Sequence, residues 1–228
     1  MRRQVCRSLL MVAALLLPSG LLAQSSPVRK IDLNPTGQEK TEKGRKLLSY
    51  IISCALGPEV EAHISVDGAD YVFRGAEGLV PDWADRAMTE TERRRVSSCL
   101  LARTNVLGVK VGIYMIIGQE PEAEDVRIAS NGQDFTLFEG MFFGDLFSEH
   151  PEGYACMGEA ALAARRDPIF KLRRCATPNG RKTKDGQEIS ACDFVITGAC
   201  SDPASFNAGG RVWSEVMQVW LRPHQPED

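Results

Sequence analysis

The alternation of apolar and polar positions predicts two amphipathic helices. Within Thr41–Leu56, the apolar residues of KLLSYIISCA recur three and four positions apart, and Gly57-Pro58 marks the end of this helix. Thr89 and Glu92 have the spacing of a capping box, so we expect a second helix to begin there. Its apolar positions continue to about Val106.

The stretch EAHISVDGADYVFRG contains the clearest β-hairpin of the chain. Apolar residues alternate with polar ones on both sides of Asp67-Gly68, a dipeptide that is typical of type I′ turns. Asn131-Gly132 indicates a second hairpin within VRIASNGQDFTLFEGMFFGDLF. The five phenylalanines in and just before FEGMFFGDLF are expected to pack in the core, with a partner-binding patch as the alternative.

Three further segments resemble strands: Val109–Ile117, Asp193–Thr197 and Val216–Leu221, the last of which could also be helical. Met157–Arg166 is predicted as a short helix. Helices and strands mix without a regular βαβ order, which favours the α+β class. We therefore expect a single disulfide-linked α+β domain over residues 47–228, with two main helices and two or more β-hairpins, after a polar lead-in over residues 24–46.

The first 23 residues have the pattern of a secretory signal peptide. Three arginines precede the apolar run Leu9–Leu17, Pro18-Ser19-Gly20 interrupts it, and Ala23 is a suitable cleavage site. The alternative is a membrane anchor, but the run is shorter than the roughly 20 residues that cross a bilayer. No later segment is long and apolar enough to span a membrane. We predict a periplasmic or secreted protein.

Cysteine usage agrees with an oxidising compartment. Of the seven cysteines, Cys6 lies in the predicted leader, and an even number remains: Cys54, Cys99, Cys156, Cys175, Cys192 and Cys200. Neither the paired ligands of a zinc site nor the C-x-x-C of a redox centre occurs among them. We therefore expect disulfides, no bound metal and no cofactor.

The pairing is only partly determined by the sequence. Cys54 and Cys99 each lie on the apolar side of a predicted helix, which makes them a candidate pair. If Cys192 and Cys200 lie at the ends of one strand, they are roughly 26 Å apart and must bond to Cys156 and Cys175. If the chain folds back between them, they can bond to each other.

Six further segments, which span roughly Cys54 to Cys200, form an ordered set of motifs: FRGAEGLVPDW, VSSCLLARTNVLGVKVGIY, FEGMFFGDLF, YACMGEA, LRRCA and ACDFVITGAC. They resemble an uncharacterised family of exported, cysteine-containing proteins from myxobacteria-like bacteria. The family patterns are GLAPxW, ACLLARxNxxGxxV, EGAFYGNxF and CGFxxxGxC. This chain departs from them at Val80, Ser98, Met141, Asp145 and Asp193. The resemblance implies export and disulfides, and it implies no activity.

Candidate catalytic groups are few. The chain lacks the common nucleophile, metalloprotease and nucleotide-binding motifs, and its three histidines, His63, His150 and His224, fall in a strand, a loop and the tail. Arg103 lies within the apolar stripe of the second helix, so it needs a carboxylate. Glu77, Asp82 and Glu139 are the candidates.

One interpretation of Arg103 is functional: Trp83, Arg103 and Glu139 would form a binding pocket for a small anionic or sugar ligand. The alternative is a structural ion pair. The hydrolase hypothesis uses Glu139 and Asp82 as an acid/base pair on cell-envelope polymer.

A basic run suggests a different partner. Eight basic residues occur against the single acid Asp167, and attraction of an anionic cell-surface polymer to them is one hypothesis. The alternative is a solvated loop whose positive charges are balanced by the acidic run Glu120–Asp125. A nucleic-acid partner is not expected of a chain with net charge −3. The basic residues are Arg165, Arg166, Lys171, Arg173, Arg174, Arg181, Lys182 and Lys184. Together these features favour an exported, non-catalytic binding or envelope-associated protein.

Overall fold

The structure is a computed structural model of the chain that describes residues 28–32, 38–105, 108, 111–119, 135–159, 161, 173, 175 and 178–222. The expected signal peptide, the second hairpin turn at Asn131-Gly132 and most of the short helix expected over 157–166 lie outside these residues. Within them the fold contains two α-helices, mixed sheets and three disulfides, and it belongs to the predicted α+β class.

The N-terminal part forms a three-stranded sheet of β1 (Arg29–Asp32), β2 (Val60–Val66) and β3 (Ala69–Arg74). The β2–β3 hairpin is confirmed, and both residues of its turn, Asp67 and Gly68, have the positive φ of a type I′ turn. β1 pairs with β2 in parallel.

The described part of the predicted polar lead-in over residues 24–46 contains regular secondary structure. β1 lies within it, followed by a short 3-10 helix (Gln38–Lys40) and the first turn of α1 (Glu42–Ala55). β1 is polar because it is an edge strand whose side chains are mostly exposed. Its backbone pairs with β2, and Ile31 is the one residue of this strand that packs against the core.

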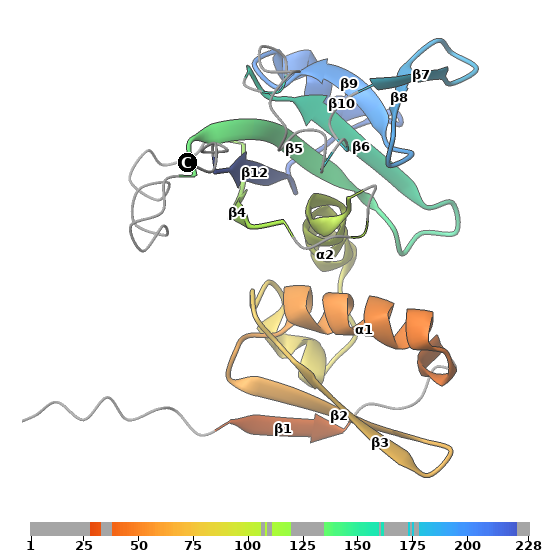
Figure 1. Cartoon of the computed structure of the whole chain (residues 1–228), viewed down its shortest axis with the longest axis vertical. Helices are drawn as coiled ribbons and strands as arrows, with labels where there is room; N and C mark the ends of the chain where they lie inside the picture. The colour runs from red at the N-terminus through yellow and green to blue at the C-terminus, as the bar shows by residue number, and fades with distance from the viewer. Residues whose placement is uncertain are drawn as a thin grey trace, which may run out of the picture.

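A larger, seven-stranded sheet forms the C-terminal part (Figure 1). Neighbouring strands in this sheet are antiparallel, except for the parallel pair β6–β9. In spatial order the strands are β4 (Ile113–Ile117), β12 (Met217–Leu221), β5 (Leu137–Asp145), β6 (Glu152–Met157), β9 (Val195–Ala199), β8 (Glu188–Ser190) and β7 (Pro178–Lys182). Four of these strands are predicted near their observed positions: β4, β9 and β12 as single strands, and β5 as the second arm of the hairpin at Asn131-Gly132. β6, β7 and β8 are not predicted, and Met157 ends β6 instead of beginning the short helix, whose described residues Glu159 and Ala161 are helical.

The second helix, α2 (Glu90–Arg103), lies between the two sheets (Figure 1). One side of α2 packs on β5 and β12, and the other side contacts α1, which in turn packs on β3. Buried residues from all of these elements form one continuous core. The opposite face of the large sheet has a second core beneath the short pair β10 (Asn207–Ala208) and β11 (Arg211–Val212).

Two of the five phenylalanines predicted to pack in the core do so, one in each of these cores, whereas Phe138 is only partly buried against the second core and Phe147 is 37% exposed. Phe142 packs in the core on the α2 side, whereas its neighbour Phe143 packs on the opposite face against Tyr154 and Trp213. Successive residues of a strand point to opposite faces, so adjacent phenylalanines serve different layers. Core packing is therefore the role of both residues.

All six cysteines expected to form disulfides do so. Cys54–Cys99 joins α1 to α2, as predicted. Of the two arrangements left open for the others, the structure has the one in which Cys192 and Cys200 bond elsewhere: the pairs are Cys156–Cys200 and Cys175–Cys192.

The three disulfides are expected to differ in their resistance to reduction. Cys54 and Cys99 are both fully buried, whereas one partner of each other bridge, Cys192 or Cys200, is partly exposed. Thiolate attack requires access to sulfur. Under limiting reductant in the folded state, alkylation and mass spectrometry should find the Cys54 and Cys99 thiols last. Their appearance first would contradict this order.

The N-terminus of α2 has the predicted capping box, reinforced by an arginine. The Glu92 backbone N–H donates to the Thr89 hydroxyl at 3.3 Å, and the Thr89 N–H donates to the Glu92 carboxylate at 2.7 Å. The Arg86 guanidinium donates to both oxygens of this carboxylate, at 2.7 and 2.6 Å. These bonds, with that of Arg86 first, lower the pKa of Glu92 from 4.5 to about 2.

This lowered pKa predicts a pH-dependent contribution to stability. Because the folded pKa lies below the unfolded one, the stabilisation is complete above pH 4.5 and is lost as the pH falls towards 2. Glu92→Gln should therefore lower the free energy of unfolding at pH 7, and its difference from wild type should shrink below pH 4.5. Urea unfolding across this range measures the effect. Glu149→Gln, at an exposed loop carboxylate, is the control and should show no such trend.

Candidate functional site

A β-bulge turns one predicted site residue, Glu139, into the core. β12 pairs Val219 with Gly140 and Trp220 with Phe138, which leaves Glu139 as the extra residue of β5. Such bulges change the direction of a side chain. The Glu139 carboxylate points to the α2 side of the sheet and is only 1% exposed.

The partner of this buried carboxylate is Arg173. The Arg173 Nε donates to the two carboxylate oxygens of Glu139 at 3.3 and 3.0 Å, and the arginine is equally buried. Its Nη2 donates to the Ala102 carbonyl oxygen at 2.7 Å, one of the carbonyls at the end of α2 that lack a helical partner. A cation there is also favoured by the helix dipole.

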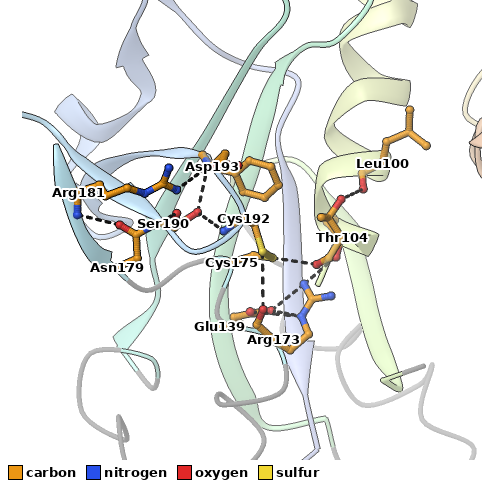
Figure 2. Close-up of a disulfide and its surroundings, with 12 residues drawn as sticks. Leu100, Thr104, Glu139, Arg173, Cys175, Asn179, Arg181, Ser190, Cys192 and Asp193 are labelled. Carbon is orange, nitrogen blue, oxygen red and sulfur yellow. Dashed lines mark hydrogen bonds and ion pairs between the residues drawn. A yellow bond between two sulfur atoms is a disulfide. The ribbon is translucent and has the colours of Figure 1, made fainter. Parts of the chain in front are cut away.

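The Cys175–Cys192 disulfide lies beside this ion pair (Figure 2). Cys175 Sγ is 3.1 Å from the Thr104 carbonyl oxygen, just beyond α2. On the other side of the bridge, the Ser190 hydroxyl accepts hydrogen bonds from the N–H groups of Cys192 and Phe194. The end of α2, the bulge in β5 and the loop after β8 are thus joined at one place.

The position of Glu139 argues against it as a catalytic group. Burial raises its pKa, and Arg173 opposes that rise. Its proposed acid/base partner, Asp82, has a side chain 69% exposed and pairs with Arg86 at 3.3 Å. A carboxylate enclosed with an arginine cannot touch a polymer substrate, so the structure does not support the Glu139–Asp82 pair.

The expected pocket of Trp83, Arg103 and Glu139 is not formed either. Arg103 reaches the Ser53 hydroxyl and pairs with Glu77, one of its three candidate carboxylates. Trp83 lies on the short 3-10 helix η2 (Pro81–Ala84) and packs partly buried against the core. The carboxylate that pairs with Arg103 comes from the loop before η2. The cation that pairs with Glu139 lies on the other side of α2. The structural ion pair is the correct interpretation of Arg103.

The predicted basic patch is smaller in the described residues. Arg173 is not part of it, because a buried carboxylate draws this arginine into the core. Arg181 pairs with Asp193, while Lys182 and Lys184 are exposed on the β7–β8 hairpin. The other four members, Arg165, Arg166, Lys171 and Arg174, lie outside the described residues.

A pocket that the sequence did not predict opens on the face of the large sheet opposite to α2. It has a volume of about 370 Å³. β5 and β12 form one side of it, and residues just after β6 and β9 form the other. We call it the β5–β12 pocket, and its lining residues are Thr136, Phe138, Met141, Glu159, Cys200, Ser201 and Trp220.

Two aromatic rings form the apolar wall of the β5–β12 pocket. Phe138 and Trp220 are cross-strand partners, with ring centroids 4.9 Å apart and planes tilted by 34°. The Trp220 Nε1 already donates to Gln218 Oε1 at 3.2 Å, so the indole presents only its ring to the pocket. Behind them the Cys156–Cys200 disulfide holds the segment after β9 against β6.

The rim of the β5–β12 pocket is polar. Thr136, Glu159 and Ser201 are all exposed. None of these three side chains forms a hydrogen bond or ion pair with the described part of the chain. No sequence motif marks this site, because its residues meet only through the pairing of β5 with β12 and the Cys156–Cys200 bridge.

Other kinds of site are not found in the described residues. They contain no group of three or more histidine, cysteine or acidic side chains that could hold a metal ion, and no helix among them is long and apolar enough to cross a membrane. Comparison of the chain with protein families, curated proteins and solved structures finds no match. The resemblance to an exported bacterial family therefore stays a prediction.

The buried ion pair predicts a large mutational effect. Arg173→Met leaves the Glu139 carboxylate buried without a partner, which typically costs about 3–5 kcal/mol of unfolding free energy. Arg181→Met removes an exposed pair with Asp193 and should cost no more than about 1 kcal/mol. Combining Arg173→Met with Glu139→Leu should recover much of the loss. Urea unfolding of the variants measures these differences, and equal losses in the two arginine variants would contradict the structural role of Arg173.

Proposed function

We propose that the protein is an exported, non-catalytic binding protein that holds a small ligand, or one end of a larger one, in the β5–β12 pocket. The observation that carries this proposal is the pocket itself. Its walls are apolar and aromatic, its rim has uncommitted polar groups, and its volume is within the usual range of ligand sites.

The cysteine chemistry supports the proposed compartment. Three disulfides that close loops between distant segments persist where thiols oxidise, as in the periplasm or outside the cell. The pattern of residues 1–23 supports the same compartment.

The chemistry of the pocket suits binding better than hydrolysis. Glycoside hydrolysis usually requires two carboxylates on either side of the scissile bond. Glu159 is the single carboxylate among the lining residues. The earlier candidate Glu139 is buried on the opposite face of the sheet, so it cannot supply the second.

An anionic polymer remains a weaker hypothesis for a second partner. Among the described residues this hypothesis rests on Lys182 and Lys184, because Arg173 is buried and Arg181 is paired with Asp193. Two lysines on one hairpin attract a polyanion less strongly than the eight-residue run predicted from the sequence would.

Blocking the β5–β12 pocket should abolish binding of small probes. Benzyl alcohol, benzylamine and benzoate can each be titrated into protein recovered from the periplasm or medium, with the Trp220 indole NMR signal as readout. We expect at least one probe to shift this signal saturably. Ser201→Phe at the rim should remove the shift, because the ring fills the opening.

The matched control for this variant is Ser214→Phe, at an exposed serine that does not line the pocket. It should bind the probe like wild type. If none of the three probes affects Trp220, or if Ser201→Phe binds them as well as wild type does, the proposed function is wrong.

A further inference from the structure

We infer that the β5–β12 pocket recognises an organic ammonium group. This inference rests on the proposed function and adds the chemical class of the ligand. Three properties of the pocket support it: the nature of its walls, the sign of its charge and its size.

The walls attract cations. The faces of tryptophan and phenylalanine rings carry negative electrostatic potential, and ammonium groups bind over them. Phe138 and Trp220 supply two such rings, and Met141, the cross-strand partner of Cys156, adds a polarisable thioether to the lining. Since the Trp220 N–H is already bonded to Gln218, this wall offers an incoming anion no hydrogen-bond donor from the indole.

The charge of the pocket has the complementary sign. Glu159 is the one charged residue among the lining residues, and it has no ion-pair partner in the described part of the chain. An anionic ligand would face this carboxylate, and a neutral ligand would leave its charge uncompensated. Arg222 lies over the Phe135 ring, 5.1 Å from its centroid, and does not line the pocket.

The size of the pocket limits the ligand. A volume of about 370 Å³ holds an ammonium group with several carbon substituents but not a polymer chain. The hydroxyls of Thr136 and Ser201 at the rim can bond a polar group attached to the cation. A compact amino or quaternary ammonium compound, or a ligand ending in such a group, therefore fits.

Choline and 3,3-dimethylbutan-1-ol test this inference, because they have nearly the same shape and differ in charge. Followed by the Trp220 indole signal, choline should bind wild type about tenfold or more tightly than the alcohol does. Glu159→Gln should weaken choline binding about fivefold or more and leave the alcohol unchanged, because it removes the charge and keeps the shape of the side chain. Glu149→Gln, the same charge change at an exposed loop residue outside the pocket, should affect neither ligand.

Other outcomes overturn the inference without ambiguity. If the alcohol binds as tightly as choline and Ser201→Phe removes both, the pocket binds ligands without selecting ammonium, and the proposed function survives alone. If Glu149→Gln weakens choline as much as Glu159→Gln does, net charge rather than the pocket is responsible. Absence of choline binding also overturns the inference, and the benzyl probes then decide the proposed function separately.

Discussion

The enclosed pair of Glu139 and Arg173 is the interaction on which the centre of this protein depends. An ion pair that is buried away from water is stable only when the hydrogen-bonding groups of both side chains have partners. Here the arginine bonds the carboxylate of β5 and a carbonyl at the end of α2. The charges are paired in only one relative position of α2, β5 (the longest strand of the large sheet) and the Cys175–Cys192 bridge.

The same bulge that places this pair also shapes the opposite face of the sheet. By inserting Glu139 between two paired residues, it sets Phe138 opposite Trp220 on the face away from α2. Gly140 beside it must be glycine, since a Cβ there would lie 2.2 Å from the Cys156 carbonyl oxygen. The bulge in β5 therefore fixes both the buried ion pair on one face of the sheet and the aromatic wall of the pocket on the other. This explains how a site without local sequence features can be well defined.

Local features of the fold were predictable from the sequence, and non-local ones were not. The capping box of Thr89 and Glu92, the Asp67-Gly68 turn and the Cys54–Cys99 pair depend on short spacings or helical periodicity. The partner of Arg173 could not be inferred, because a basic run indicates solvent exposure and nothing near it shows that β5 supplies a buried carboxylate. β1 was missed because a single apolar contact, that of Ile31, together with backbone pairing to β2 gives no alternating pattern in the sequence. The β5–β12 pocket is the extreme case, since four separate segments form it.

The connectivity of the last four cysteines has a consequence for biogenesis. The Cys175–Cys192 bridge is nested inside the Cys156–Cys200 bridge, which closes the back of the pocket. A chain that enters an oxidising compartment from its N-terminus presents Cys156 to Cys175 well before Cys200 arrives. Oxidation in order of appearance therefore gives a non-native bond, and the native one requires thiol–disulfide exchange. In a chain exported as we propose, the pocket is therefore completed only after the rearrangement that forms the Cys156–Cys200 bond.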